Sequence, residues 1–313
     1  MIKVDLITGF LGSGKTTFLK KYVSFLLKNN IRVGILENDY GAVNVDVMLL
    51  DELEKSGCLI ESVAGACDRD CHMRRFKTKL IALAMSGCER VVIEPSGLFD
   101  TDEFFDTLRE EPLDRWYETG SVIAVADCML DKNMSEFSEY MLASECANAG
   151  RIILSKTQLY GNDVIADTVS TIQKALEGCG CKRDISGVLV KKPWDEFSND
   201  DMKAFTLCGS HNAGFIKKYR DIEGFSTVYF MNTGLSLQDA AKKASALFMD
   251  KQYGSIFRVK GFVKDGDEWY ELNASAGGTR IAPSSVGQDI IIVIGENISK
   301  EKINDFFGGI SNG

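Results

Sequence analysis

The chain has 313 residues, of which 45% are hydrophobic and 26% charged, as in a globular protein that buries its own core. Its 36 Lys and Arg against 45 Asp and Glu leave a net charge of −9, which excludes a broad basic surface for nucleic acid or anionic lipid. The sequence has no apolar run of membrane-spanning length and no apolar signal-peptide core at its start. We therefore expect a cytoplasmic protein with reduced cysteines and with neither nucleic acid nor membrane as a partner.

The first half of the chain alternates short apolar, β-branched runs with longer helical patterns. This alternation predicts an α/β fold with a mostly parallel sheet covered by helices on both faces, because each strand returns to the sheet through a helix. Strands are expected at 2–8, 31–37, 90–94, 121–127 and 151–155. Helices are expected at 15–28, 71–85, 101–108, 134–148 and 163–177.

The character of the sequence changes after this region. A polar stretch with few apolar residues predicts a linker over 186–224, which separates a first domain over 1–185 from a smaller domain over 225–313. Strand and helix patterns are mixed in the last part, and this mixture indicates a small α+β domain. Its strands are expected at 226–231, 255–262, 268–272 and 289–294, and its helices at 236–249 and from 299 onward.

A phosphate-binding motif lies between the first expected strand and the first expected helix. Residues 9–16 read GFLGSGKT, and we call this segment the phosphate loop. Glycines let successive backbone N–H groups point at phosphate oxygens, and the N-terminus of the following helix adds its positive end. The residues expected to bind nucleotide here are Gly9, Gly12, Ser13, Gly14, Lys15, Thr16 and Thr17. Lys15 is expected to reach the β- and γ-phosphates, and the Thr16 hydroxyl is expected to bind Mg²⁺.

A buried strand further along the chain ends in a carboxylate. Residues 91–97 read VVIEPSG, so Glu94 closes the strand and Gly97 follows it. A carboxylate on a second strand holds the magnesium shell in many phosphate-loop proteins, directly or through water. Gly97 leaves a backbone N–H free to approach a γ-phosphate. The sequence therefore predicts a phosphate-loop NTPase.

Three segments together resemble one family. Residues 8–19, residues 38–41 with Asp46, and residues 93–98 are similar to the CobW-type metallochaperone GTPases, relatives of the urease and hydrogenase nickel-insertion GTPases. The resemblance implies a switch that binds GTP, hydrolyses it slowly and delivers a transition metal, or assists cofactor assembly, on a client protein. It implies that Asp46 assists Thr16 and Glu94 around Mg²⁺, and that Lys15, Glu94 and Asp46 act in hydrolysis.

The segment after the fifth expected strand departs from the pattern of that family. The family has Asn or Ser, then Lys, any residue and Asp, and this chain has Ser155, Lys156 and Gln158. The resemblance implies that the lysine stem lies over the purine and that the aspartate accepts hydrogen bonds from guanine. An amide both donates and accepts, so Gln158 leaves GTP as the favoured nucleotide with ATP as a competitor.

Four residues are candidates for a transition-metal site. Cys67 and Cys71 are four residues apart and share one face if a helix begins between them, and His72 follows directly. With Asp39 they would offer ligand types that suit Zn²⁺ or another transition metal. The family carries a Cys-x-Cys-Cys cluster here, whereas this chain has no adjacent pair. The alternative interpretation is that these cysteines are small buried hydrophobic residues.

The remaining cysteines carry less information about function. Cys58, Cys88, Cys128 and Cys146 lie in apolar stretches and are expected in the core. Cys179 and Cys181 flank a glycine and are expected to be exposed in a turn.

Two alternatives to a metal-delivering GTPase stay open at the level of sequence. One is an ATP-using small-molecule kinase, although the chain shows no recognisable arginine-rich lid. The other is a non-hydrolysing nucleotide sensor or scaffold for a corrinoid or metallocofactor system. The expected partner is a client metalloprotein or a cofactor-assembly protein, and a homodimer is compatible with the sequence. Hydrolysis is expected to be slow because no glutamine or arginine is evidently placed to complete the phosphoryl-transfer site.

Overall fold

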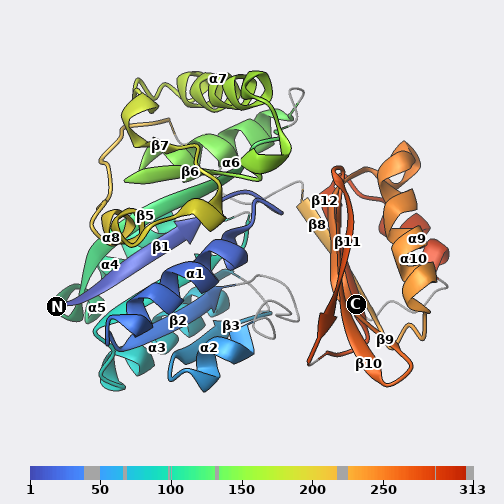
Figure 1. Cartoon of the computed structure of the whole chain (residues 1–313), viewed down its shortest axis with the longest axis horizontal. Coiled ribbons are helices and arrows are strands. Elements are labelled where there is room, and N and C mark those ends of the chain that lie inside the picture. Colours follow the sequence, from blue (N-terminus) through green and yellow to red (C-terminus); the bar gives the residue numbers. More distant parts are fainter. Residues whose placement is uncertain are drawn as a thin grey trace. The chain divides into compact units, whose positions relative to one another are not determined.

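The computed structural model describes residues 1–38, 50–65, 69–97, 99, 101–130, 134–216, 225–285 and 287–307. The chain divides into two compact units, Met1–Arg220 and Asp221–Gly313, and each is described by itself (Figure 1). Within the described ranges, no helix combines the length and the apolar character that crossing a membrane requires.

The first unit is built on a seven-stranded sheet in the order β3-β2-β4-β1-β5-β6-β7, and every pair of neighbours is parallel. The strands are β1 (Ile2–Thr8), β2 (Val33–Asn38), β3 (Leu59–Val63), β4 (Arg90–Pro95), β5 (Tyr117–Asp127), β6 (Arg151–Ser155) and β7 (Leu189–Val190). This sheet confirms the predicted α/β class. The strands β3 and β7 were not predicted, because β3 carries Glu61 and Ser62 and β7 has only two residues.

Helices cover both faces of this sheet (Figure 1). The helices of the unit are α1 (Lys15–Lys28), α2 (Asp51–Lys55), α3 (Arg69–Met85), α4 (Thr101–Leu108), α5 (Leu113–Trp116), α6 (Glu136–Ala147), α7 (Asn162–Gly178) and α8 (Asn199–Thr206). Alternate side chains of β2 face opposite layers. Val33 and Ile35 join the core formed with α1, α2 and α8, whereas Gly34 lies against Leu83 of α3.

The predicted linker over 186–224 is wrong for its first thirty or so residues. Val190 of β7 pairs with Ile153 of β6, and Met202 and Phe205 of α8 are buried in the core of the first unit. The boundary between the units falls after Arg220 instead. The polar composition suggested a linker because α8 is amphipathic. Its solvent-facing side chains outnumber Met202 and Phe205, the two that enter the core.

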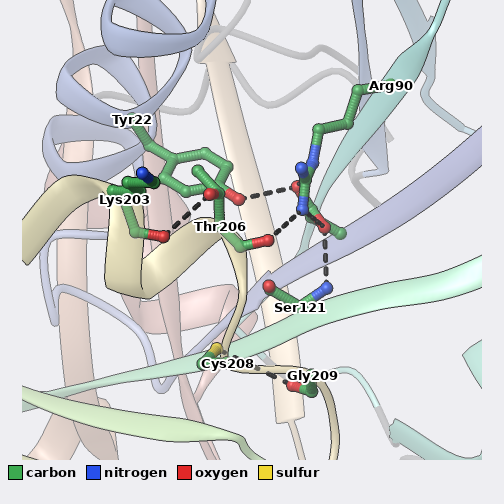
Figure 2. Close-up of polar contacts among 8 residues, drawn as sticks. Tyr22, Arg90, Ser121, Lys203, Thr206, Cys208 and Gly209 are labelled. Carbon is green, nitrogen blue, oxygen red and sulfur yellow. Dashed lines mark hydrogen bonds and ion pairs between the residues drawn. The ribbon is translucent and has the colours of Figure 1, made fainter.

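A buried ion pair ties α1, α8 and three strands together (Figure 2). The Arg90 guanidinium donates two hydrogen bonds to Asp5, which has no exposed surface. Asp5 also accepts from the Tyr22 hydroxyl at 2.7 Å and from the Ser121 N–H at 2.7 Å. Arg90 donates in addition to the Thr206 carbonyl at the end of α8, at 2.7 Å. Both charged groups of this pair therefore have several hydrogen-bond partners, which offset the cost of burying the charges.

The second unit contains a five-stranded antiparallel sheet in the order β11-β10-β9-β12-β8. The strands are β8 (Phe225–Met231), β9 (Ser255–Asp265), β10 (Glu268–Ser275), β11 (Gly278–Ser284) and β12 (Ile290–Glu296). Two helices, α9 (Leu237–Met249) and α10 (Lys300–Phe307), pack on one face and enclose an apolar core with it (Figure 1). The predicted α+β character is confirmed, and the strand β11 was not predicted.

Candidate functional site

The predicted nucleotide-binding residues come from strands whose carboxyl ends share one edge of the parallel sheet. The phosphate loop follows β1, Glu94 lies in β4, and Ser155 ends β6. Because β4, β1, β5 and β6 are consecutive neighbours, their carboxyl ends form one continuous row. Ligands of open parallel sheets bind at this edge.

The phosphate loop has backbone conformations that glycine favours. Gly9 has φ +148°, and a Cβ on it would lie 2.1 Å from the carbonyl oxygen of Val125 in β5. Gly14 has φ +100° and directly precedes the first residue of α1. A side chain at Gly9 would therefore clash with the sheet, and one at Gly14 would strain the turn into the helix.

The Lys15 ammonium lies on the carbonyl oxygens of its own loop. It donates to Gly9 at 2.6 Å and to Phe10 at 3.4 Å, and the residue is only 6% exposed. A charged amine at this depth requires compensation. The carbonyl oxygens of the loop therefore supply the hydrogen-bond partners that the ammonium needs at this depth.

Thr16 and Glu94, both predicted magnesium ligands, lie together. The Thr16 hydroxyl donates to Glu94 Oε1 at 2.7 Å, across 78 residues of sequence. Gly97 lies against the phosphate loop, since a Cβ on it would be 2.7 Å from the backbone nitrogen of Leu11. Hydroxyl and carboxylate oxygens are the donor set that Mg²⁺ prefers, so the residues present suit that ion. Asp46, the third predicted ligand, is outside the described residues.

Lys156 is held between two elements of the site. Its backbone has φ +59°, and its ammonium pairs with Asp127 at the end of β5 and lies 3.5 Å from the Gly12 carbonyl oxygen. Gln158 is exposed in the short 3₁₀ helix over Thr157–Leu159. The sequence analysis did not predict Asp127 as a site residue. Its position at the carboxyl end of a strand, like that of Glu94, could have indicated it.

Several buried hydroxyls at this edge have no hydrogen-bond partner within the described residues. The group consists of Thr8, Ser13, Ser155 and Thr157. Leaving a buried hydroxyl unbonded costs roughly 1–3 kcal/mol. Polar groups that a bound phosphate ester, ribose or base brings to the site could satisfy them.

A buried carboxyl that was not predicted as a site residue lies near enough to the phosphate loop to interact with the charge of Lys15. Glu145 of α6 is 1% exposed, and neither carboxyl oxygen has a hydrogen-bond partner within the described residues. Burial raises the pKa of Glu145 to about 8, and the positive charge of Lys15 acts in the opposite direction. This carboxyl is therefore largely protonated at neutral pH.

The candidate transition-metal residues are only partly described. Asp39 and Cys67 lie outside the described residues, whereas Cys71 is half-buried in the first turn of α3 and His72 is fully buried. His72 Nε2 donates a hydrogen bond of 2.6 Å to Asn38 Oδ1 at the end of β2. Metal binding through Nε2 would require this bond to break, whereas binding through Nδ1 would not. The described residues by themselves contain no group of three metal-ligating side chains.

The other thiols behave mainly as core residues. Cys58, Cys88, Cys128 and Cys146 are buried as predicted, and burial raises the pKa of Cys58 to about 12 and that of Cys128 to about 11. The prediction that Cys179 and Cys181 are exposed is wrong, because they are only 2% and 1% exposed. The backbone turns back after α7, and the Cys181 N–H bonds to the Leu176 carbonyl, which brings both thiols under the helix end.

The chain matches the family model described as CobW/HypB/UreG, nucleotide-binding domain, over residues 3–181. This match extends over more than half of the chain. The chain belongs to this family. The resemblance noted in the sequence is thereby confirmed, and the family's domain coincides with the part of the first unit that carries the phosphate loop, Glu94 and Lys156.

Individual relatives match over part of their length. The zinc chaperone YjiA of Escherichia coli (strain K12) is 30% identical over 165 residues, which cover 51% of this chain and 51% of that protein. The zinc chaperone YeiR of the same organism is 28% identical over 158 residues, covering 50% and 47%. The zinc-regulated GTPase metalloprotein activator 1 of Schizosaccharomyces pombe is 24% identical over 180 residues, covering 55% and 43%. The chain spans about half the length of the curated relatives it matches.

A solved structure of the Zn(II)-bound YjiA GTPase from E. coli aligns over 99% of both chains, with 18% sequence identity and a TM-score of 0.35. A structure of HypB from Helicobacter pylori in complex with nickel aligns over 66% of this chain and 84% of that one, with 17% identity and a TM-score of 0.40.

Proposed function

We propose that this protein is a nucleotide-dependent switch that binds GTP with Mg²⁺, hydrolyses it slowly and uses the cycle to deliver a transition metal to a client protein. The observation that carries the nucleotide part is the 2.7 Å hydrogen bond between Thr16 and Glu94, directly beside the buried Lys15. The names of the relatives, two zinc chaperones and a zinc-regulated activator, support the metal part.

The phosphate site works through position and charge. Lys15 exchanges the carbonyl oxygens of its own loop for the β- and γ-phosphate oxygens, and the loop amides bind the same groups. Thr16 and Glu94 would hold a magnesium ion, with Asp46 as the third candidate. Bound there, Mg²⁺ would supply positive charge to offset that of the phosphates. Gly97 lies against Leu11, which brings its backbone N–H beside the loop.

The base site is proposed to favour GTP over ATP only moderately. Lys156 is oriented by Asp127 and the Gly12 carbonyl, and Gln158 follows two residues later with an exposed side chain. An aspartate at 158 would accept from both the ring N–H and the amino group of guanine, which the amide cannot do. Gln158→Asp should therefore raise the ratio of GTP to ATP affinity, and an unchanged ratio would show that residue 158 does not read the base.

The metal cargo is proposed to bind Asp39, Cys67 and Cys71, with His72 as a ligand or as a support. The His72 hydrogen bond to Asn38 supports a link to the nucleotide, because Asn38 directly precedes the segment 39–46 and His72 directly follows Cys71. A change of the segment 39–46 on hydrolysis would act on the metal ligands through this bond. Asn38→Ala keeps all four candidate ligands and should reduce the effect of nucleotide on metal affinity.

The metal part is tested by titrating the reduced full-length protein with zinc, cobalt and nickel in competition with a chelator, with and without GTP and Mg²⁺. Cys67→Ala and Cys71→Ser should weaken binding, and GTP should change the affinity of the unaltered protein. Cys208→Ser is the matched control, because Cys208 is also half-buried but follows α8. Equal affinities for all four proteins in both nucleotide states would rule out this metal site.

The nucleotide part is tested separately by equilibrium binding of GTP and ATP. Lys15→Ala should abolish binding of both nucleotides, since it removes the only cation placed inside the phosphate loop by the motif. Retained affinity in this variant would refute the assignment of the phosphate loop.

A further inference from the structure

The phosphate loop is in contact with a tryptophan that lies 180 residues away in the sequence. A Cβ on Gly14 would lie 2.8 Å from Cη2 of Trp194 and 3.6 Å from both Cζ2 and Cζ3. These three atoms are the nearest ones to that position, and all belong to the benzene ring of the indole. The ring therefore packs directly on the last loop residue before α1.

Several contacts fix Trp194 in this place. Its ring meets Phe18 of α1 edge to face, at 6.0 Å between centroids and 66° between planes. The next residue, Asp195, forms an ion pair of 2.8 Å with Lys21 of α1. The indole Nε1 is buried without a hydrogen-bond partner among the described residues, so packing holds the ring. An aromatic ring of this size offers a large rigid surface with little loss of entropy.

The position of β7 explains why the tryptophan reaches the loop. Val190, the last residue of β7, pairs with Ile153 of β6. The segment that follows β7 therefore leaves the sheet at the same edge as Lys156, three residues beyond Ile153. It then runs as a short 3₁₀ helix, Trp194–Glu196, against α1.

We propose that Trp194 is a positioning residue for the phosphate loop, an inference that rests on the proposed binding of nucleotide there. Its ring holds Gly14 at φ +100°, ψ +20° and thereby aims the first N–H groups of α1 at the phosphate. Glycine can occupy many other conformations at little cost, so an unsupported Gly14 would populate geometries in which these amides diverge. Trp194 removes those alternatives before the ligand arrives, and this preorganisation raises affinity.

This role makes a prediction about which part of the nucleotide is affected. Loss of the ring should lower the affinities for GTP, ATP and inorganic tripolyphosphate by the same factor, because all three ligands would bind the loop amides. We expect a loss of about tenfold in Trp194→Leu, which corresponds to ~1.4 kcal/mol of binding free energy. Trp194→Phe retains an aromatic ring beside Phe18 and should recover part of the loss.

The matched control is Phe197→Leu. Phe197 packs against the same core, with ring centroids 6.5 Å from Phe18 and 5.1 Å from Phe205. Its replacement removes a similar aromatic contact from that core but leaves the indole on Gly14. Phe197→Leu should therefore lower the thermal stability about as much as Trp194→Leu and leave the affinities unchanged.

A spectroscopic measurement tests the contact between Trp194 and the phosphate loop directly, and an emission that does not change at saturating ligand would contradict that contact. The full-length variant Trp116→Phe/Trp269→Phe has Trp194 as its single tryptophan. Adding tripolyphosphate with Mg²⁺ should change its emission, because the ring lies on the loop that binds the ligand.

The affinities separate the possible outcomes. If the unaltered protein binds GTP and Trp194→Leu binds it equally well, or if Phe197→Leu loses as much affinity, the positioning role is wrong while the proposed function stands. A changed ratio of GTP to ATP affinity in Trp194→Leu would make Trp194 a base contact and overturn the proposal. If the unaltered protein binds none of the three ligands, the proposed function itself fails.

Discussion

At the scale of single residues, the site depends on a few polar side chains with defined partners. Thr16 donates to Glu94, Lys15 donates to its own loop, and Lys156 lies between Asp127 and Gly12. The contacts of Thr16 and Lys156 join residues that are remote in sequence, whereas that of Lys15 lies within the phosphate loop. Their removal should therefore change one specific property and leave the fold intact.

The contact between Thr16 and Glu94 predicts a defect in magnesium binding. Thr16→Ala and Glu94→Gln should each lower the affinity for Mg²⁺ in the presence of GTP by roughly 10–100-fold, because each removes one oxygen ligand or its partner. Nucleotide binding measured in EDTA should change little. Titration of Mg²⁺ against the rate of phosphate release checks this.

The control for this prediction is Thr171→Ala on the exposed face of α7, where the hydroxyl bonds only within its helix to the Asp167 carbonyl. Its magnesium dependence should equal that of the unaltered protein. An unchanged magnesium dependence in both Thr16→Ala and Glu94→Gln would place the ion elsewhere.

The buried Glu145 predicts a pH dependence of stability. Burial raises its pKa from 4.5 to about 8, so between these values the folded state keeps a proton that the unfolded state releases. The free energy of unfolding should therefore fall as pH rises from about 5 to 8, with a slope of up to about 1.4 kcal/mol per pH unit from this group. Glu145→Gln removes this slope and should stabilise the protein at pH 8.

Urea unfolding at several pH values measures the effect of Glu145, with Glu139→Gln as the control. Glu139 lies on the same helix but is exposed. If the stability of Glu145→Gln follows the same pH profile as that of the unaltered protein, Glu145 is not the titrating group.

At the scale of elements, one buried ion pair joins the sheet to α1 and α8. Burial alone would lower the pKa of Arg90, but the hydrogen bond and the negative charge of Asp5 outweigh it and raise that pKa (Figure 2). Burial and the nearby Asp5 charge also raise the pKa of Tyr22. The network thus keeps Arg90 charged and Tyr22 protonated, and it connects the C-terminal end of α8 to the strand that leads into the phosphate loop.

Arg90→Ala should destabilise the protein by about 3–5 kcal/mol, because it leaves the Asp5 carboxylate buried without its counter-charge. The control is Arg109→Ala, which breaks an ion pair with Asp106 whose side chains are 77% and 73% exposed. That change should have an effect below about 1 kcal/mol. Chemical unfolding measures the stability of both variants. Similar unfolding midpoints for the two would contradict a stabilising role of the buried pair.

At the scale of the whole molecule, the two units have separate cores. The first core is formed by α1, α2, α8 and the parallel sheet, and the second by α9, α10 and the antiparallel sheet. All residues proposed to bind nucleotide belong to the first unit, as does the positioning residue Trp194. A unit with its own core can in principle fold alone.

A fragment of residues 1–220 should therefore fold and bind GTP with an affinity within about twofold of the full-length protein. A fragment that ends at residue 185, where the sequence alone placed the domain boundary, should fold poorly, because it lacks β7, α8 and Trp194. Circular dichroism and nucleotide titration of both fragments check this. Equal behaviour of the two fragments would show that residues 186–220 are dispensable.

The sequence by itself determined the features that are local along the chain. The phosphate loop, its flanking strand and helix, the carboxylate of Glu94 and the family can be identified because each depends on a short contiguous pattern. The strand order, β7 and the course of residues 186–216 depend on pairing between distant segments, which leaves little trace in local composition. Only the tertiary structure decided that Asp127 pairs with Lys156, that His72 bonds to Asn38 and that Trp194 packs on Gly14. The physical reason is that these contacts arise where neighbouring strands end at one edge of the sheet, and the order of those neighbours is set by the packing of the whole unit.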